Sequence, residues 1–212
     1  MKVLLVGNPN VGKSAFFSRL TGVRVIASNY PGTTVGFSKG YLKLGEEKAE
    51  IIDVPGTYSL EPTCKAEEVA VEMLSEGDIV INVLDSTNLE RNLFLTLQLM
   101  EKEVPMVVAL NMWDDTKHRG IFIDPDRLEE LLGVPVVPTV AVSGQGIKDL
   151  VNRIPEAKVP APAGRTHAEM WAEVGRIVEE VQTVTHRHHT WRERLSDASI
   201  QPLTGIPIAG LA

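Results

Sequence analysis

Three features are scarce in this sequence of 212 residues, and each scarcity argues against a class of protein. Its single cysteine, Cys64, cannot form an internal disulfide, so we expect a reducing compartment. Lysine and arginine number 21 against 28 acidic residues, and the net charge of −7 argues against a nucleic-acid partner. No apolar run reaches the roughly 18 residues that a membrane span needs, and the first strand begins too early to leave room for a signal peptide.

A phosphate-binding loop is present near the start of the chain, with the letters G-N-P-N-V-G-K-S at positions 7–14. It follows an apolar run and precedes a predicted helix from Lys13 to about Leu20, the strand–loop–helix context that this motif requires. Its glycines let backbone N–H groups turn toward anionic oxygens, and the helix N-terminus adds positive potential. Lys13 can reach the outer phosphates, and the Ser14 hydroxyl can join a magnesium shell. We predict nucleoside triphosphate binding by Gly7, Asn8, Asn10, Val11, Gly12, Lys13, Ser14 and Ala15.

Strand and helix patterns alternate along the rest of the chain, which predicts an α/β fold, the doubly wound and mostly parallel sheet of a Ras-like P-loop GTPase. The second and third strands are joined by a turn at 45–47 and should form an antiparallel edge hairpin. Residues 21–34 are polar and interrupted by glycine and proline, and we expect a mobile loop there. The six predicted strands are 3–6, 35–44, 49–54, 78–84, 105–110 and 134–137.

Capping signals mark where two of the helices begin. Thr87 and Glu90 are spaced as a capping box. Asp124 before Pro125 is typical of an N-cap followed by the first helical residue, and Gly133 should end that helix.

Two further segments would complete the phosphate and magnesium site. Asp53-Val54-Pro55-Gly56 follows an apolar strand, which places Asp53 near Mg²⁺ through a water and leaves the Gly56 N–H free to turn toward the γ-phosphate. The loop at 27–35 should supply the second hydroxyl ligand of Mg²⁺. We predict Thr34 for this role, because a threonine directly before the edge strand can close over the γ-phosphate, and Thr33 is the alternative.

The base is predicted to be guanine. Asn111-Met112-Trp113-Asp114 ends a strand and matches N-x-x-D, and Asp114 can accept hydrogen bonds from the guanine N1–H and 2-amino groups, which adenine cannot supply. Thr139-Val140-Ala141 is the third GTPase motif, and the Ala141 N–H would donate to the guanine O6. GTPases usually carry serine where this chain has Val140, so the support for this motif is its position shortly before the last predicted helix.

Intrinsic hydrolysis is expected to be slow. Ras-like enzymes carry a glutamine directly after the glycine of D-x-x-G to orient the attacking water, and this chain has Thr57 there. Asn10 resembles the P-loop asparagine of potassium-activated GTPases, whose side-chain oxygen and loop carbonyls hold K⁺ beside the phosphates and so offset developing charge. The alternative is that Asn10 only caps the loop. The predicted catalytic residues are Asn10, Lys13, Thr34 and Gly56.

The composition changes after a helix predicted at 147–154, where prolines and glycine accumulate in the manner of a linker. We therefore divide the chain into a GTP-binding domain at 1–158 and a second part at 159–212, a linker followed by a helical segment.

A capping box of Thr166 and Glu169 predicts a helix in this second part. Apolar residues recur on one of its faces, which predicts packing against the main domain rather than a cofactor role. That face comprises Met170, Val174, Ile177, Val181 and Val184. For three histidines near its end we favour a solvated helix terminus over a metal site, because the spacing offers no fourth ligand. They are His186, His188 and His189.

These motifs together resemble one family, the N-terminal cytosolic domain of ferrous iron transport protein B (FeoB). Beside the loop at 7–14, the resemblance is carried by N-Y-P-G-T-T-V at 29–35, D-V-P-G-T-Y-S-L at 53–60 and N-M-W-D at 111–114, where Met112 replaces the lysine of Ras-like proteins. It extends to T-W-R-E-R-L-S-D at 190–197 and L-T-G-I-P-I at 203–208, which are similar to the family's junction with its membrane part.

The resemblance implies a GTP-binding module that regulates or drives Fe²⁺ uptake, at the cytoplasmic face of the bacterial inner membrane. It implies GTP/GDP, Mg²⁺ and K⁺ as cofactors. It also implies the membrane permease region of the same polypeptide and small Feo accessory proteins as partners. In that family a helical domain, said to resemble a GDP-dissociation inhibitor, links the G domain to the membrane helices, and here fewer residues follow Pro160 than the family usually spends on it. The resemblance therefore implies that 159–212 is a linker and an abbreviated helical domain leading to a missing membrane region.

Two other functions compete with this interpretation. A soluble assembly GTPase of the Era or tRNA-modification type shares the P-loop asparagine and the missing glutamine, but such proteins carry RNA-binding domains that tend to be basic, and this chain is acidic. A nucleotide-sensing switch that never turns over usefully would bind GTP without releasing phosphate.

Overall fold

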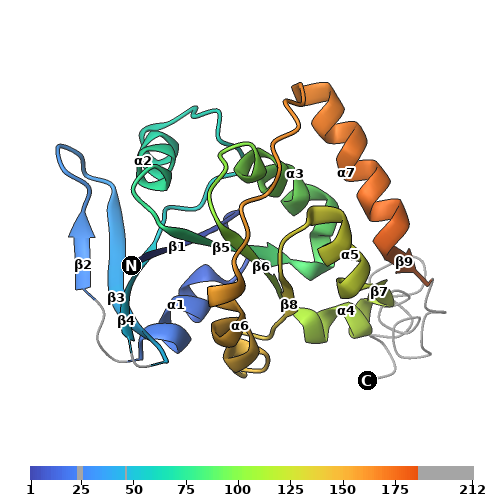
Figure 1. The fold of residues 1–212 in the computed structure, drawn as a ribbon, viewed down its shortest axis with the longest axis horizontal. Helices are drawn as coiled ribbons and strands as arrows, with labels where there is room; N and C mark the ends of the chain where they lie inside the picture. The colour runs from blue at the N-terminus through green and yellow to red at the C-terminus, as the bar shows by residue number, and fades with distance from the viewer. Residues whose placement is uncertain (23–25, 46, 186–212) are drawn as a thin grey trace, which may run out of the picture.

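The computed structural model describes residues 1–22, 26–45 and 47–185. Its main feature is a sheet of strands in the order β2-β3-β4-β1-β5-β6-β8 (Figure 1). Strand β3 pairs antiparallel with both β2 and β4. The neighbouring strands in the rest of the order, β4-β1-β5-β6-β8, pair in parallel. The strands of this sheet are β1 (Lys2–Gly7), β2 (Ile26–Asn29), β3 (Gly36–Leu44), β4 (Glu47–Asp53), β5 (Ile79–Asp85), β6 (Met106–Asn111) and β8 (Val136–Pro138).

The predicted fold class is confirmed, with one strand more than predicted in the main sheet and a second sheet of two strands, β7 (Ile121–Ile123) and β9 (Gln182–Val184), that was not predicted. The hairpin of β3 and β4 is antiparallel as predicted, from Ser38 opposite Asp53 to Leu44 opposite Glu47, but it does not form the sheet edge, contrary to the prediction. The additional strand is β2, which lies inside the segment predicted to be a loop and forms the sheet edge beyond β3. Its four residues show no alternation of buried and exposed positions, so pairing with β3 is what makes them a strand.

Helices cover both faces of the sheet and enclose two apolar clusters. On one face, α1 and α6 pack over Leu5, Ile81 and Val107. On the other, α2, α3, α5 and α7 pack over Leu4 and Val80. The helices are α1 (Lys13–Thr21), α2 (Lys65–Leu74), α3 (Leu89–Met100), α4 (Trp113–Arg119), α5 (Pro125–Leu132), α6 (Ile147–Arg153) and α7 (His167–Val181).

The capping predictions had mixed outcomes. Helix α5 begins after Asp124, whose carboxylate accepts the Arg127 N–H, and ends at Gly133, as predicted. The capping box predicted for Thr87 and Glu90 is wrong: the Asp85 carboxylate accepts both the Thr87 N–H and its hydroxyl, so a short 3₁₀ turn forms before α3. The helix α4 has no counterpart in the sequence-based prediction.

Helix α7 lies along the side of the molecule, against α3 and α5 (Figure 1). It begins with the predicted capping box and buries the predicted apolar face as far as Val181. Val184 does not belong to that face, because the helix has ended and β9 (Gln182–Val184) pairs with β7 (Ile121–Ile123), which leaves Val184 exposed. Trp171 stacks on Phe94 of α3 with ring centroids 4.5 Å apart. The three predicted helix-terminal histidines at 186, 188 and 189 lie outside the described residues.

No helix in the described parts of the chain combines the length and apolar character needed to cross a membrane. The predicted division at residue 158 remains a prediction.

Candidate functional site

The parallel strands end at one edge of the sheet, and the predicted phosphate-binding loop lies there between β1 and α1. Gly7 ends β1, and a Cβ at this position would lie 2.4 Å from the backbone oxygen of Val83, so only glycine fits. Gly12 caps α1 with φ near +89°, a conformation that glycine adopts without strain. Asn10 also adopts the left-handed conformation, at φ 68°, and it is exposed to solvent. The loop therefore curls as the motif predicts and presents Asn10 to solvent.

Asn8 is buried behind this loop. Its Nδ2 donates to the Arg91 backbone oxygen at 3.3 Å, while its Oδ1 has no partner among the described residues. Val11 is buried too, and its backbone oxygen accepts a hydrogen bond from Asn111. These contacts connect the loop to α3 and β6.

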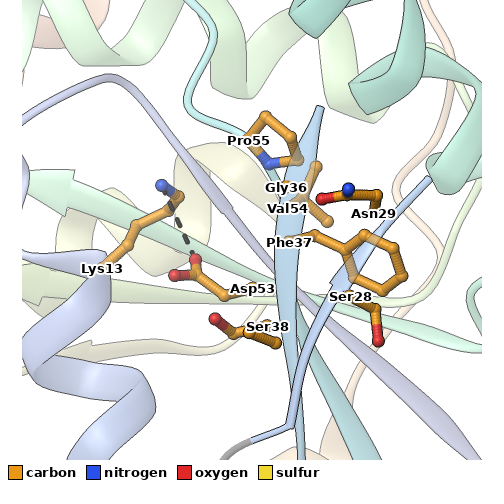
Figure 2. A pocket seen from close by; sticks show the side chains of 10 residues that line it. Lys13, Ser28, Asn29, Gly36, Phe37, Ser38, Asp53, Val54 and Pro55 are labelled. Carbon is orange, nitrogen blue, oxygen red and sulfur yellow. Dashed lines mark ion pairs between the residues drawn. The ribbon is translucent and has the colours of Figure 1, made fainter. Parts of the chain in front are cut away.

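Lys13 and Asp53 face each other at the mouth of the site, with Nζ and Oδ1 3.7 Å apart (Figure 2). A cavity of about 430 Å³ opens beside them, and Figure 2 shows Ser38 next to Asp53 and Ser28 farther away, near Phe37. The Asp53 Oδ1 is buried and accepts no hydrogen bond from any described residue. A buried carboxylate oxygen without a donor is the kind of group that a bound cation and its waters satisfy. Asp53 therefore fits the predicted role near Mg²⁺.

Burial raises the pKa of Asp53, because removing the carboxylate from water disfavours its charged form. The nearby Lys13 ammonium partly offsets this effect. The site thus holds a buried carboxylate whose charge the Lys13 ammonium stabilises only in part.

The two candidate magnesium hydroxyls of the 27–35 loop differ in their contacts. The Thr33 hydroxyl donates to the Tyr30 backbone oxygen at 3.0 Å and accepts the Val35 N–H at 3.2 Å, so it holds the loop together. Thr34 is exposed, as is Ser14 at the start of α1. Since the Thr33 hydroxyl is already engaged, the contacts favour Thr34 as the residue left available for a metal.

The segment after β4 packs directly on the phosphate-binding loop. A Cβ on Gly56 would lie 3.2 Å from the Cα of Pro9, so this close approach favours glycine. Thr57 is 1% exposed, and its hydroxyl donates to the Ser59 backbone oxygen at 2.5 Å and to Glu67 at 3.4 Å. A buried and engaged Thr57 side chain cannot orient a water as a glutamine would.

Asn111 joins the phosphate-binding loop to the predicted base-binding residues. Its Nδ2 donates to the Val11 oxygen at 2.8 Å, and its Oδ1 accepts the Ala141 N–H at 3.0 Å. The N-x-x-D segment and residues 139–146, which we call the base loop, are therefore held together beside the P-loop. The Ala141 N–H that we predict for the guanine O6 is engaged with Asn111 in this structure, and its donation to the base remains a prediction.

The remaining nucleotide-binding candidates are Met112, Asp114, Val140 and Ala15. Met112 adopts the left-handed conformation at φ 58°, which turns the chain into α4, and its side chain reaches the vicinity of Gly12. Asp114 is exposed in the first turn of α4. Val140 is buried, and its N–H donates to the Gln145 oxygen at 3.0 Å, which closes the base loop. Ala15 lies in the first turn of α1, where its N–H is bonded to the Gly12 oxygen.

Sequence reasoning missed two arginines at this site. Arg19 of α1 donates to two carbonyl oxygens of the base loop. Arg91 lies over the Tyr58 ring, 4.4 Å from its centroid, and so attaches the segment after Asp53 to α3. Neither contact can be recognised from a local sequence motif, because each arginine and its partner are far apart in the sequence. Within 1–22, 26–45 and 47–185, no group of three or more His, Cys, Asp or Glu side chains is placed to hold a metal, so protein side chains alone form no metal cage there.

Comparison with known proteins places this geometry in a family. The family model for ferrous iron transport protein B matches residues 1–154. A Porphyromonas gingivalis Fe(2+) transport protein A/Fe(2+) transporter FeoB fusion protein is 46% identical over 157 residues, which cover 73% of this chain and 19% of that protein. The chain thus spans about a fifth of the length of the curated relatives it matches.

Solved structures of FeoB domains are similar to this chain as well. The cytosolic domain of L. pneumophila FeoB superposes with a TM-score of 0.82 at 30% identity, covering 86% of this chain and all of that one. A GDP-bound mutant of the S. thermophilus FeoB G-domain gives a TM-score of 0.71 at 33% identity, covering 95% of this chain and 70% of that one. The chain belongs to the ferrous iron transport protein B family, and it corresponds to the N-terminal G domain.

Proposed function

We propose that this chain binds GTP and GDP with Mg²⁺, hydrolyses GTP slowly, and is stimulated by K⁺. The observation that carries the proposal is the convergence of the phosphate-binding loop, Asp53, Asn111 and the base loop at one edge of the sheet. The GDP in the S. thermophilus relative supports the choice of nucleotide.

Different residues of the site would bind the phosphates, the metal and the base. The loop from Gly7 to Lys13 would hold the phosphates through backbone N–H groups and the Lys13 ammonium. Bound Mg²⁺ would neutralise charge on the phosphate oxygens, held by Ser14 and Thr34 and, through a water, by Asp53. Asp114 would select guanine.

Thr57 is buried, so this chain has no glutamine-like group at that position to orient the attacking water. Stabilisation must then come from charge near the phosphates. Asn10 is exposed in a left-handed turn of the loop, a position from which its amide oxygen can reach a cation beside the phosphates. That placement supports a K⁺ site.

In the full-length protein, we propose that the nucleotide state of this domain is coupled to Fe²⁺ uptake through a membrane region of the same polypeptide. The domain would then lie at the cytoplasmic face of the inner membrane, where small accessory proteins could reach it. The family assignment supports this transporter role over a soluble assembly GTPase.

Steady-state phosphate release tests the proposal. With GTP and Mg²⁺, turnover should rise about tenfold when Na⁺ is replaced by K⁺, a barrier change of about 1.4 kcal/mol. Asn10→Ala should abolish the rise while nucleotide binding persists, and Asn152→Ala, at an exposed position on α6, should behave as wild type. Binding without phosphate release in either salt would identify a non-cycling switch. Equal turnover in both salts would reduce Asn10 to a loop-capping residue.

A further inference from the structure

Arg19 connects the helix behind the phosphate-binding loop to the base loop. It lies in the last turn of α1, and its Nε donates to the Ala141 backbone oxygen at 3.1 Å. Its Nη2 donates to the next carbonyl, that of Val142. A Cβ built on Gly144 would also lie 3.8 Å from this guanidinium, so the arginine lies directly against the loop. One side chain thus holds two successive peptide units.

Hydrogen bonds within the base loop close it on itself, and Arg19 adds a contact that joins it to α1. Gly144 and Gly146 both have positive φ, at 87° and 73°, and glycines leave a backbone with more freedom than other residues do. Val142 is 78% exposed, so apolar packing does not restrain the outer part of the loop. On the other side, Asn111 accepts the Ala141 N–H and donates to Val11. Ala141 is therefore fixed by its N–H to β6 and by its oxygen to α1.

Both tethers lead back to the phosphate-binding unit, since Asn111 bonds to its loop and Arg19 belongs to the helix that follows it. In a trans peptide unit the C=O and N–H point in opposite directions. With the Ala141 and Val142 carbonyls turned toward Arg19, the N–H groups of Val142 and Ser143, which share these two peptide units, point away from α1. The guanidinium fork suits this task, because it donates to two acceptors in fixed geometry.

We infer that Arg19 is a positioning residue for guanine binding, which orders the base loop against α1 and so sets how long the nucleotide stays bound. The inference rests on the proposed guanine-nucleotide function. Arg19 touches neither the base nor the phosphates in this account, and it acts through the loop alone.

Stopped-flow release of a fluorescent GDP analogue tests the inference. Arg19→Met keeps the apolar stem and removes both donors, and we expect release to be about tenfold faster, with kcat at saturating GTP unchanged. Arg19→Lys can donate to one carbonyl and should recover part of the loss. Arg127→Met removes an arginine that pairs on the surface with Glu130 and Glu180 and should match wild type.

A second readout separates positioning from general destabilisation. The 2-aminopurine ribonucleoside diphosphate lacks the O6 that the base loop is predicted to meet and also the N1–H, whereas inosine diphosphate keeps both and lacks only the 2-amino group. Arg19→Met should therefore weaken GDP and inosine diphosphate by a similar factor and change the affinity for the 2-aminopurine nucleotide little. Unchanged GDP release, or equal loss for all three nucleotides, would overturn the inference. A wild-type chain that binds no guanine nucleotide would instead refute the proposed function itself.

Discussion

Replacing Asn111 by alanine tests the link on which the site geometry depends. The side chain is 3% exposed and makes one hydrogen bond on each side, to the Val11 oxygen at 2.8 Å and from the Ala141 N–H at 3.0 Å. Asn111→Ala removes both and leaves a buried acceptor and a buried donor without partners. Each such orphan costs about 1–3 kcal/mol, so we expect the free energy of unfolding to fall by about 2–4 kcal/mol, allowing for some relaxation.

Urea unfolding of the nucleotide-free protein measures this change. Asn152→Ala on α6 is the matched control, because that asparagine is exposed, and it should stay within about 0.5 kcal/mol of wild type. The nucleotide should also leave Asn111→Ala faster, since the P-loop and base loop lose their shared anchor. A decrease in the unfolding free energy of less than about 0.5 kcal/mol for Asn111→Ala would show that the two hydrogen bonds do not form. The P-loop and the base loop would then not be joined through Asn111.

Two further predictions concern Asp53 and α7. Burial raises the folded-state pKa of Asp53, so its contribution to stability is present at acid pH and is lost as the pH rises through that value. Asp53→Asn should therefore stabilise the ligand-free protein at pH 7 by about 0.5–2 kcal/mol in urea unfolding, with the gain shrinking on acidification. A destabilised variant at pH 7 would mean that the attraction of Lys13 outweighs desolvation. Trp171→Ala removes the stacking on Phe94 and should lower the unfolding free energy by about 1–2 kcal/mol, with exposed Glu179→Ala as control. Equal stability of both α7 variants would show that the stacking does not hold that helix.

Local sequence rules predicted the parts of the fold that local chemistry determines. The strand–loop–helix of the P-loop, the hairpin of β3 and β4, the Asp124 cap and the Thr166–Glu169 capping box all depend on residues within a few positions of one another. In each case the contact partner is adjacent in sequence, so its spacing is visible there.

The misses have physical reasons. Strand β2 owes its conformation to pairing with β3, and β7 to pairing with β9, some 60 residues away. The Thr87 N–H donates to the carboxylate of Asp85, so it is not available to the Glu90 side chain as a capping box requires. Arg19 donates to the backbone oxygen of Ala141, which is 122 residues away in the sequence, and no periodicity or motif predicts such a contact. Candidate ligand-binding residues could therefore be named from local motifs, and their roles remain predictions, whereas the contact of Arg19 with the base loop could not be read from the sequence.

The central claim is that this chain is a guanine-nucleotide domain, and competition binding with a fluorescent GDP analogue tests it most directly. GTP and GDP should displace the analogue and ATP should not, and Asp114→Ala should weaken GTP by about 2–4 kcal/mol, because the guanine N1–H and 2-amino groups lose their acceptor. Asp115→Ala, at the neighbouring exposed position of α4, serves as the control and should bind as wild type. Comparable displacement by ATP and GTP in the wild-type protein would contradict the account.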